Sequence, residues 1–451
     1  MAELKKSLTL FTLTMIAIGS CIGSGIFRTP GTKVAAFLPD STLALSVWVL
    51  GGVITLTGAL TFAELGTIFT KRGGMYVYQK EAYGDITAFM YGWSLLFVTN
   101  TGSIAGLAAA FSDFLSVLIP IDYVCFHIGS WALNFKTVVA LLAIITITLI
   151  NVIGIDYSKF FTNIFTSAKL LGIFAIIFIG IFLAPKLPDV PPSVMENIHT
   201  PSGFNLITAY LTALVGVLWA YGGWQHASFL SGETINPSKT VPRAMIIGAI
   251  VVTAVYILIN IAYLRLLPIN QIITSKQIAT DAVSSLYPQA GKWIAVLITI
   301  SVFGTAGIYT LSCPRIYFAM AEDKIFFPSL AKVHPKFKTP ANAIIVQSIW
   351  ASCLLLFWGT FEDLIDYVTF VDWIFYALTG AAVFIFRKKL ANITRTYKVP
   401  LYPFVPLIFV IISSAFVINA LFQNYVQAIA GIIVMLMGFP LYYYFKKKII
   451  Q

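Results

Sequence analysis

The chain has 451 residues, of which 59% are hydrophobic and 10% are charged, and its mean hydropathy is +0.88. A soluble domain carries about 25% charged residues, so this composition excludes an ordinary soluble protein and indicates a polytopic membrane protein. The formal net charge of +11 taken alone would suggest a nucleic-acid partner. Basic residues gathered in loops on one side of a membrane explain the charge better, so we expect no nucleic-acid partner.

Apolar stretches long enough to cross a bilayer recur along the whole chain. One crossing needs about 20 apolar residues, and the sequence predicts an all-α integral membrane protein with about 12 transmembrane helices. The predicted spans are residues 8–36, 41–69, 86–118, 136–154, 160–184, 206–231, 243–267, 290–321, 341–358, 364–386, 402–422 and 427–445. No soluble domain fits between these spans, so residues 1–451 are expected to form a single transmembrane domain.

Lysine and arginine are distributed unequally between the predicted loops. With the N-terminus inside, one side of the membrane holds the large majority of the basic residues, among them Lys71, Arg72, Arg387 and Lys388. Positively charged loops are retained in the cytoplasm. We therefore expect a multi-pass protein of the cell membrane, inner or plasma, in contact with the lipid bilayer and with both termini cytoplasmic.

Two predicted spans, the first and the sixth, are interrupted near their middles by glycine. The first interruption reads Gly19-Ser20-Cys21-Ile22-Gly23-Ser24-Gly25-Ile26-Phe27, and the second reads Trp219-Ala220-Tyr221-Gly222-Gly223-Trp224. An unpaired peptide group in a bilayer costs several kcal/mol, so a spanning helix is seldom interrupted without a function. Paired interruptions in two halves of a chain indicate the midplane binding site of a secondary transporter.

The first interruption is suited to an anion. Gly19 and Gly23 alone would also serve close packing of two helices. Gly25 adds a third glycine and Ser24 a hydroxyl at the same depth, and glycine allows the backbone to unwind. The N–H groups at the start of the next half-helix, together with the positive end of its dipole, favour a carboxylate.

The second interruption is suited to a cation. Trp219, Tyr221 and Trp224 surround it, but an aromatic belt belongs at the membrane interface, whereas these residues lie near mid-span. Carbonyl groups freed there would accept hydrogen bonds from an ammonium group. An α-amino acid carries both charges on one carbon, so the pair of interruptions predicts an L-amino acid substrate.

Lys169 lies near the centre of the fifth predicted span. A lysine near a helix end can snorkel to the interface, but from mid-span its reach is poor, and a central lysine costs roughly 2.5–3.5 kcal/mol on insertion scales. Two functional roles remain open from the sequence. Lys169 either supplies a fixed positive charge in place of a bound sodium ion or carries a proton.

Other polar residues in the spans give weaker signals. Asn100 is expected either to line the cavity or to bond another helix, and Glu233 to gate or cap a cytoplasmic turn. Asp366 and Asp372 in the tenth predicted span receive no assignment. Because Lys169 is the only charged residue expected beside the interruptions, a cationic substrate side chain would find no counter-ion there. Neutral substrates are therefore favoured.

No sequence pattern indicates catalysis or a bound cofactor. The histidines and cysteines form no Ser/His/Asp cluster and no metal-ligand spacing, and no Walker A sequence is present. We therefore expect no catalytic residues, no metal site and no cofactor, and the chain is not expected to be an enzyme.

Several of these segments resemble one known family. Gly23-Ser24-Gly25-Ile26-Phe27 is similar to the first-helix motif of the amino acid–polyamine–organocation superfamily, and residues 64–84, which include Gly73-Gly74-Met75-Tyr76-Val77-Tyr78, are similar to its second-helix signature. The second interruption and residues 315–340 match as well. The resemblance covers nearly the whole chain. It is closest to the L-type amino acid transporter branch and, within it, to bacterial serine/threonine exchangers.

The resemblance implies a LeuT-type fold with a 5+5 inverted repeat. The first repeat would be residues 8–184 and the second 206–386, with two additional helices in 402–445. It implies that the substrate carboxylate is held by Ile22, Gly23, Ser24, Gly25 and Ile26, and the substrate amine by the carbonyls of Trp219, Ala220 and Tyr221. It further implies that Trp219 gates the site and that Lys169 occupies the sodium position, which makes transport independent of sodium.

One departure from the family concerns the eighth span. Many relatives have an Asn-Gly pair there, where this chain has Gly307-Ile308 followed by Tyr309. The remaining candidate pocket residues are Asn100, Gly222, Gly307 and Tyr309.

The sequence thus predicts a sodium-independent exchanger of small to medium neutral L-amino acids that works by alternating access, without an obligatory protein partner. The alternatives are a proton-coupled amino acid or amine/polyamine permease and, from another class, a membrane nutrient sensor.

Overall fold

The structure is a computed structural model that describes residues 4–128, 131–185, 200–357, 361–423 and 425–450. In chain order its elements are α1 Leu10–Cys21, α2 Gly25–Thr29, η1 Pro30–Ala35, α3 Ser41–Ile68, α4 Met75–Tyr83, α5 Asp85–Ser94, η2 Leu95–Thr99, α6 Asn100–Ser116, β1 Val124–Ile128, β2 Trp131–Asn134, α7 Phe135–Ile153, α8 Ile155–Phe178, η3 Ile179–Leu183, α10 Gly203–Tyr221, α11 His226–Phe229, η4 Ser231–Glu233, α12 Pro237–Leu266, α13 Ile269–Thr274, α14 Ile278–Ser284, α15 Ala290–Ser312, α16 Pro314–Glu322, η5 Pro328–Ala331, α17 Ala341–Phe357, α18 Phe361–Lys389, α19 Phe404–Gln423, α20 Tyr425–Leu436 and α21 Gly438–Ile450.

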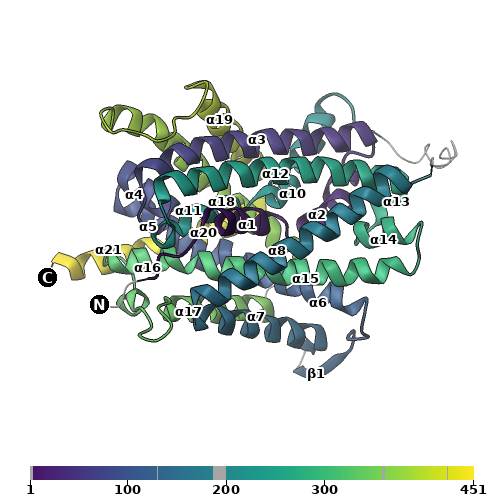
Figure 1. Cartoon of the computed structure of the whole chain (residues 1–451), viewed down its shortest axis with the longest axis horizontal. Coiled ribbons are helices and arrows are strands. Elements are labelled where there is room, and N and C mark those ends of the chain that lie inside the picture. Colours follow the sequence, from purple (N-terminus) through teal and green to yellow (C-terminus); the bar gives the residue numbers. More distant parts are fainter. Residues whose placement is uncertain (1–3, 129–130, 186–199, 358–360, 424, 451) are drawn as a thin grey trace.

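The long helices form one bundle and run between two opposite ends of it (Figure 1). The helices α4, α16 and α21 lie at one end, on the left of Figure 1, which we call the terminal face. The helices α13 and α14 lie at the other end, which we call the opposite face. Long helices that cross from face to face are the arrangement that a bilayer requires, because their backbone groups are satisfied within each helix.

Eleven stretches of the described chain are helical, long and apolar enough to cross a membrane. They are Leu10–Ala35, Ser41–Ile68, Asp85–Ser116, Phe135–Ile153, Ile155–Leu183, Gly203–Tyr221, Pro237–Leu266, Ala290–Glu322, Val368–Lys389, Phe404–Phe422 and Ala428–Lys447. The helix α17 occupies the ninth predicted span but has only 17 described residues. The all-α membrane architecture is confirmed. The described residues contain eleven long apolar helices and one shorter one, where about 12 spans were predicted.

Large apolar side chains cover the outside of the bundle. Phe182 is 71% exposed and Phe204 is 80% exposed, and both belong to helices long enough to span. In water such apolar surface would favour association. A hydrocarbon environment accepts these side chains, so their exposure agrees with a protein surrounded by lipid.

One small element departs from the all-α prediction. The strands β1 and β2 pair antiparallel between α6 and α7, where the sequence predicted only a loop. The segment contains β-branched and aromatic residues such as Val124, Phe126 and Trp131, which favour extended backbone. The connection predicted near residues 185–205 lies mostly outside the described residues.

Local sequence explains where the helices start. Asp40 precedes α3, and its Oδ1 accepts hydrogen bonds from the N–H groups of Thr42 and Leu43, each 2.9 Å long. The helix α12 begins with Pro237 at its first position. Both are favoured at helix N-termini, because a carboxylate caps free N–H groups and proline has no N–H group to satisfy.

The centre of the bundle is formed by the helices that carry the interruptions and by the helices beside them. α3 packs along α12, and α1 packs against α8, α12 and α15. α10 contacts both α2 and α3. The interrupted first and sixth spans are therefore enclosed by other helices, which keeps their irregular backbone away from lipid.

Buried ion pairs join the helices near the terminal face. Glu233 and Arg315 have fully buried side chains and lie 2.6 Å apart. The backbone N–H groups of Ser7 and Leu8 donate to the carbonyl oxygen of Glu233. Glu233 therefore connects the N-terminal segment to α16. Removing one partner of such a buried ion pair is strongly destabilising.

A second buried acid lies in α3. Glu64 pairs with Arg387 at 2.6 Å and with Arg395 at 3.2 Å, and its Oε2 accepts from the N–H group of Val399. Three donors compensate the buried carboxylate, which connects α3 to α18 and to the segment that follows it.

Candidate substrate site

The first interruption lies where the sequence predicts it. The helix α1 ends at Cys21 and α2 begins at Gly25. Among the described residues, the hydroxyl of Ser24 has no hydrogen-bond partner, although this side chain is fully buried. Within this segment the N–H groups of Ile22 and Gly23 donate to the carbonyls of Ile18 and Cys21. The first N–H groups of a helix have no acceptor within it, so the N–H groups of Ser24, Gly25 and Ile26 are the donors left for a ligand.

The second interruption is stabilised by Gln225, which was not among the residues predicted from the sequence. α10 ends at Tyr221 and α11 begins at His226, and between them Gly223 has a φ of 129°, which glycine adopts readily. The Gly223 N–H group donates to Oε1 of Gln225 over 2.9 Å, and Nε2 of Gln225 donates to the hydroxyl of Tyr376. A side chain thus replaces the missing helical partner.

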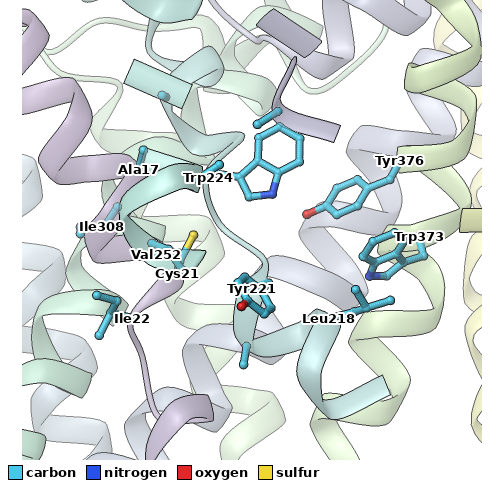
Figure 2. Close-up of a cluster of buried hydrophobic side chains, with 14 of the residues drawn as sticks. Ala17, Cys21, Ile22, Leu218, Tyr221, Trp224, Val252, Ile308, Trp373 and Tyr376 are labelled. Atoms are coloured by element: carbon cyan, nitrogen blue, oxygen red, sulfur yellow. The ribbon is translucent and has the colours of Figure 1, made fainter. Parts of the chain in front are cut away.

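The two interruptions touch each other. The hydroxyl of Ser20 donates to the carbonyl of Gly223 over 2.8 Å. A Cβ atom placed on Gly25 would lie 2.8 Å from Cβ of Ala220 and 2.9 Å from the ring of Trp219, so the Trp219 ring contacts Gly25 directly. Figure 2 shows the same neighbourhood, with Cys21 and Ile22 of the first span near Tyr221 of the sixth.

Tyr256 of α12 bonds both interruptions at once. Its hydroxyl oxygen lies 2.8 Å from the Cys21 carbonyl oxygen and 2.9 Å from that of Ala220. The Ala220 carbonyl, which the sequence assigns to the substrate amine, therefore has one acceptor position used within the protein. A carbonyl oxygen has two lone pairs, so one remains for a ligand.

We expect Tyr256→Phe to destabilise the protein by about 1–3 kcal/mol, because the single proton that the Tyr256 hydroxyl shares between two buried carbonyl oxygens would be lost. Tyr263→Phe is a matched control in the same helix, since among the described residues the buried Tyr263 hydroxyl has no hydrogen-bond partner. Thermal unfolding of the two purified variants in one detergent measures the difference. Equal loss of stability in both variants would contradict a bridging role for Tyr256.

Lys169 is bonded to the first interruption. Its side chain is 1% exposed, and Nζ lies 2.9 Å from the carbonyl oxygen of Gly19, 2.7 Å from that of Ile22 and 2.7 Å from Oγ1 of Thr305. The ammonium has three donors and uses all of them. α8 is thereby joined to both α1 and α15 at the point where α1 stops.

Two small cavities lie beside the second interruption, and their volumes are about 10 and about 20 Å³. Each has room for about one water molecule. The first is lined by Asn100 and His226, among others, and the second by Trp219 and Gly222. Tyr309 lines both of them.

The other predicted pocket residues differ in their positions. Asn100 both lines a cavity and bonds another helix, because its Nδ2 donates to Oε1 of Gln347 over 2.8 Å. Gly307 lines neither cavity. A Cβ atom on Gly307 would meet the ring of Phe161, and its carbonyl accepts from Asn151 over 3.2 Å. The structure thus places Gly307 at a packing contact with α8.

The structure corrects the prediction that Lys169 is the only charged residue beside the interruptions. Asp372 of α18 lines both cavities and shares the second one with Trp219 and Gly222. The sequence shows that Asp372 lies in a span, but not which side of α18 faces the broken helix. Figure 2 shows Trp373 and Tyr376 of the same helix beside this region.

Larger basins lie apart from the cavities. One, of about 900 Å³, is lined by Arg28, Asp113 and Lys136, and another, of about 430 Å³, by Arg72 and Glu322. Neither basin shares a lining residue with the two small cavities. In the larger basin Arg28 pairs with Asp113 at 2.8 Å, which joins α2 to α6.

Comparison with known proteins identifies the family of this chain. The amino acid permease family matches residues 8–440. The serine/threonine exchanger SteT of Bacillus subtilis (strain 168) is 37% identical over 451 residues, which cover 99% of this chain and 98% of the relative.

Two mammalian relatives align over 98% of this chain. The b(0,+)-type amino acid transporter 1 of Mus musculus is 31% identical, with 89% of its own length covered. The large neutral amino acids transporter small subunit 2 of Homo sapiens is 30% identical, with 80% covered. With a match over nearly its whole length and two interrupted spans that meet at the centre of the bundle, the chain belongs to the amino acid permease family.

Proposed function

We propose that this protein is a sodium-independent exchanger of neutral L-amino acids. One observation carries the proposal: the two interrupted helices meet, so that free backbone donors of the first lie beside backbone acceptors of the second. The α-carboxylate and α-ammonium groups of one amino acid need this pair of partners at short range. The relatives named as an exchanger and as amino acid transporters support the same class of substrate.

The substrate carboxylate is assigned to the segment from Ile22 to Ile26. The orphan hydroxyl of Ser24 and the unsatisfied N–H groups at the start of α2 support this assignment. The amine is assigned to the carbonyls of Trp219, Ala220 and Tyr221. The first two each accept one hydrogen bond within the protein, from Gly222 and from Tyr256, and each keeps a second lone pair.

Alternating access is the transport mechanism that we propose. The cavities beside the second interruption are small and separate from both basins, as expected for a site closed to both sides. Trp219, whose ring contacts Gly25, acts as the gate over the substrate. We propose that residues 8–184 and 206–386 are inverted repeats, that residues 402–445 add two helices, and that one helix bundle rocks to open the site to either side in turn.

The protein is proposed to work in the cell membrane with both termini in the cytoplasm and without an obligatory protein partner. The excess of basic residues in loops of one side supports the orientation. One relative is named as a small subunit, so a partner is the alternative. Purification of the chain alone followed by transport measurement separates the two cases.

Exchange in liposomes tests the proposed function. Purified protein should take up labelled serine or leucine severalfold faster when the vesicles contain unlabelled substrate. The binding site of an obligate exchanger returns to the outside only after it has bound a substrate molecule inside. Replacing external sodium by choline should leave the rate unchanged. Uptake driven by a pH gradient without internal substrate would indicate a proton-coupled permease, and binding without uptake would indicate a sensor.

Substrate analogues test the two binding segments. Removing either the α-carboxylate or the α-amine should lower competition with labelled substrate by about tenfold or more, since buried polar groups in the site would be left unpaired. The matched set is leucine, isoamylamine and 4-methylpentanoate. If isoamylamine competes as well as leucine, the amine-permease alternative is correct.

A further inference from the structure

Asp372 is one of the residues that line both cavities. Within the part of the chain that the structure describes, no lysine or arginine forms an ion pair with it. Lys169, the cation of the site, bonds Gly19, Ile22 and Thr305 instead. His226 lines one of the cavities, but its Nδ1 bonds the hydroxyl of Ser312 over 2.6 Å.

A carboxylate in this position needs a partner. Charged side chains within membrane spans are costly and commonly mark the path of a substrate or ion. Away from bulk water, an ionised carboxylate is tolerated when a cation or several donors compensate its charge. Glu64 and Glu233 show the compensated case in this protein, since each is paired with arginine. Asp372 has no arginine partner among the described residues, and the donor beside it is the side chain of Thr99.

A second acceptor belongs to Asn100, which lines the first cavity together with Asp372. Asn100 donates through Nδ2 to Gln347 over 2.8 Å and to the hydroxyl of Tyr317 over 3.3 Å. Its Oδ1 has no hydrogen-bond partner among the described residues, although Asn100 is only 2% exposed. Because Asn100 and Asp372 line one cavity, an amide oxygen without a donor and a carboxylate together favour a ligand that is rich in donors. An ammonium group has three donors and no acceptor.

We propose that Asp372 and Asn100 form a subsite for the side-chain ammonium of a short cationic amino acid. The inference rests on the proposed function and extends its substrates from neutral to short cationic amino acids, because the α-amino and α-carboxyl groups of both kinds of substrate bind at the two interruptions. The subsite adjoins them through the second cavity, which reaches from Trp219 and Gly222 to Asp372. Each cavity has room for about one water molecule, which suits the ammonium group of a short side chain better than that of a long one.

The probe is the pair 2,4-diaminobutyrate and homoserine, which share chain length and differ by an ammonium in place of a hydroxyl. Each competes with exchange of labelled serine in liposomes that contain the wild-type protein. We expect 2,4-diaminobutyrate to compete about tenfold better than homoserine, because hydrogen bonds to charged groups are worth more than neutral ones. Equal competition, or preference for homoserine, overturns the subsite.

Variants decide whether Asp372 causes the preference. Asp372→Asn keeps the shape and removes the charge, so the ratio between the two competitors should fall to about twofold or less, while Asp372→Glu should restore most of it. If Asp372→Asn does not yield folded protein, Asn100→Leu should reduce the same ratio. An unchanged ratio in a folded Asp372→Asn or Asn100→Leu protein overturns the proposal.

The ratio also separates this inference from the proposed function. Wild-type protein that exchanges serine but shows no preference for 2,4-diaminobutyrate refutes the subsite alone. Wild-type protein that exchanges no amino acid at all refutes the proposed function, and the subsite with it.

Discussion

Gly25→Val is expected to reduce amino acid exchange by about a hundredfold or more, equivalent to a loss of about 2.7 kcal/mol or more in binding. Any Cβ at this position would lie 2.8 Å from Cβ of Ala220 and 3.0 Å from its Cα, so the two interruptions would have to move apart. The branched side chain would also fill the space through which the backbone donors reach a carboxylate. Uptake of labelled serine into preloaded liposomes measures the effect.

The contact with Ala220 changes what this variant tests. From the sequence alone, valine would block only the ligand and leave folding intact, whereas the structure shows that it also presses on the backbone of the second interruption. Gly66→Ala in α3 is the matched control, because its added Cβ would find ordinary contacts of 3.4 Å or more. Normal exchange by a folded Gly25→Val protein would refute the assignment of the carboxylate to this segment.

The interruptions themselves could be predicted because their cause is local. Glycine and serine clustered in the middle of an apolar span stand out against a bilayer that penalises free peptide groups. The helices do stop at Cys21 and Tyr221. Lys169 stood out for a similar reason, as a lysine far from either end of its span, and the structure brings it to the carbonyl of Ile22.

The partners of the interruptions could not be predicted, because they depend on how separate helices are rotated against each other. Tyr256 is one of 21 tyrosines, and nothing near it in the sequence shows that its hydroxyl reaches both Cys21 and Ala220. Asp372 was visible as a charge in a span, but only the packing of α18 brings it to the cavity beside Gly222. Gly307 was named as a pocket candidate from the resemblance alone, and only the structure shows that it lies against Phe161.

The interactions of Lys169 explain why its charge should matter more than its bulk. Its ammonium donates to Gly19, Ile22 and Thr305, and the carbonyls of Gly19 and Ile22 are released by the end of α1. Thr305 also lies within 3.0 Å of both carbonyl oxygens, but a hydroxyl has a single proton to donate. The Ser301 hydroxyl reaches only the Ile22 oxygen, over a long 3.4 Å. Without the lysine, both buried carbonyls would therefore lose their short charged donor, at a cost of about 1–3 kcal/mol.

Lys169→Met is therefore expected to lower exchange by about a hundredfold, a loss of about 2.7 kcal/mol, although methionine keeps much of the length and packing of the side chain. Lys169→Ala should fail as well. Lys159→Met in the same helix is the control, because Lys159 forms a peripheral ion pair with Asp156, and such pairs contribute about 0–1 kcal/mol. Serine exchange by all three variants in sodium and in choline tests the role of the charge.

The wild-type protein decides between a fixed cation and a proton carrier. If the Lys169 ammonium replaces a sodium ion, the wild-type exchange rate does not change when sodium is replaced by choline or when a pH gradient is imposed. Accumulation of substrate driven by the pH gradient would instead make Lys169 a proton carrier. Severalfold stimulation of the wild type by sodium, or normal exchange by Lys169→Met, would show that the assignment is wrong.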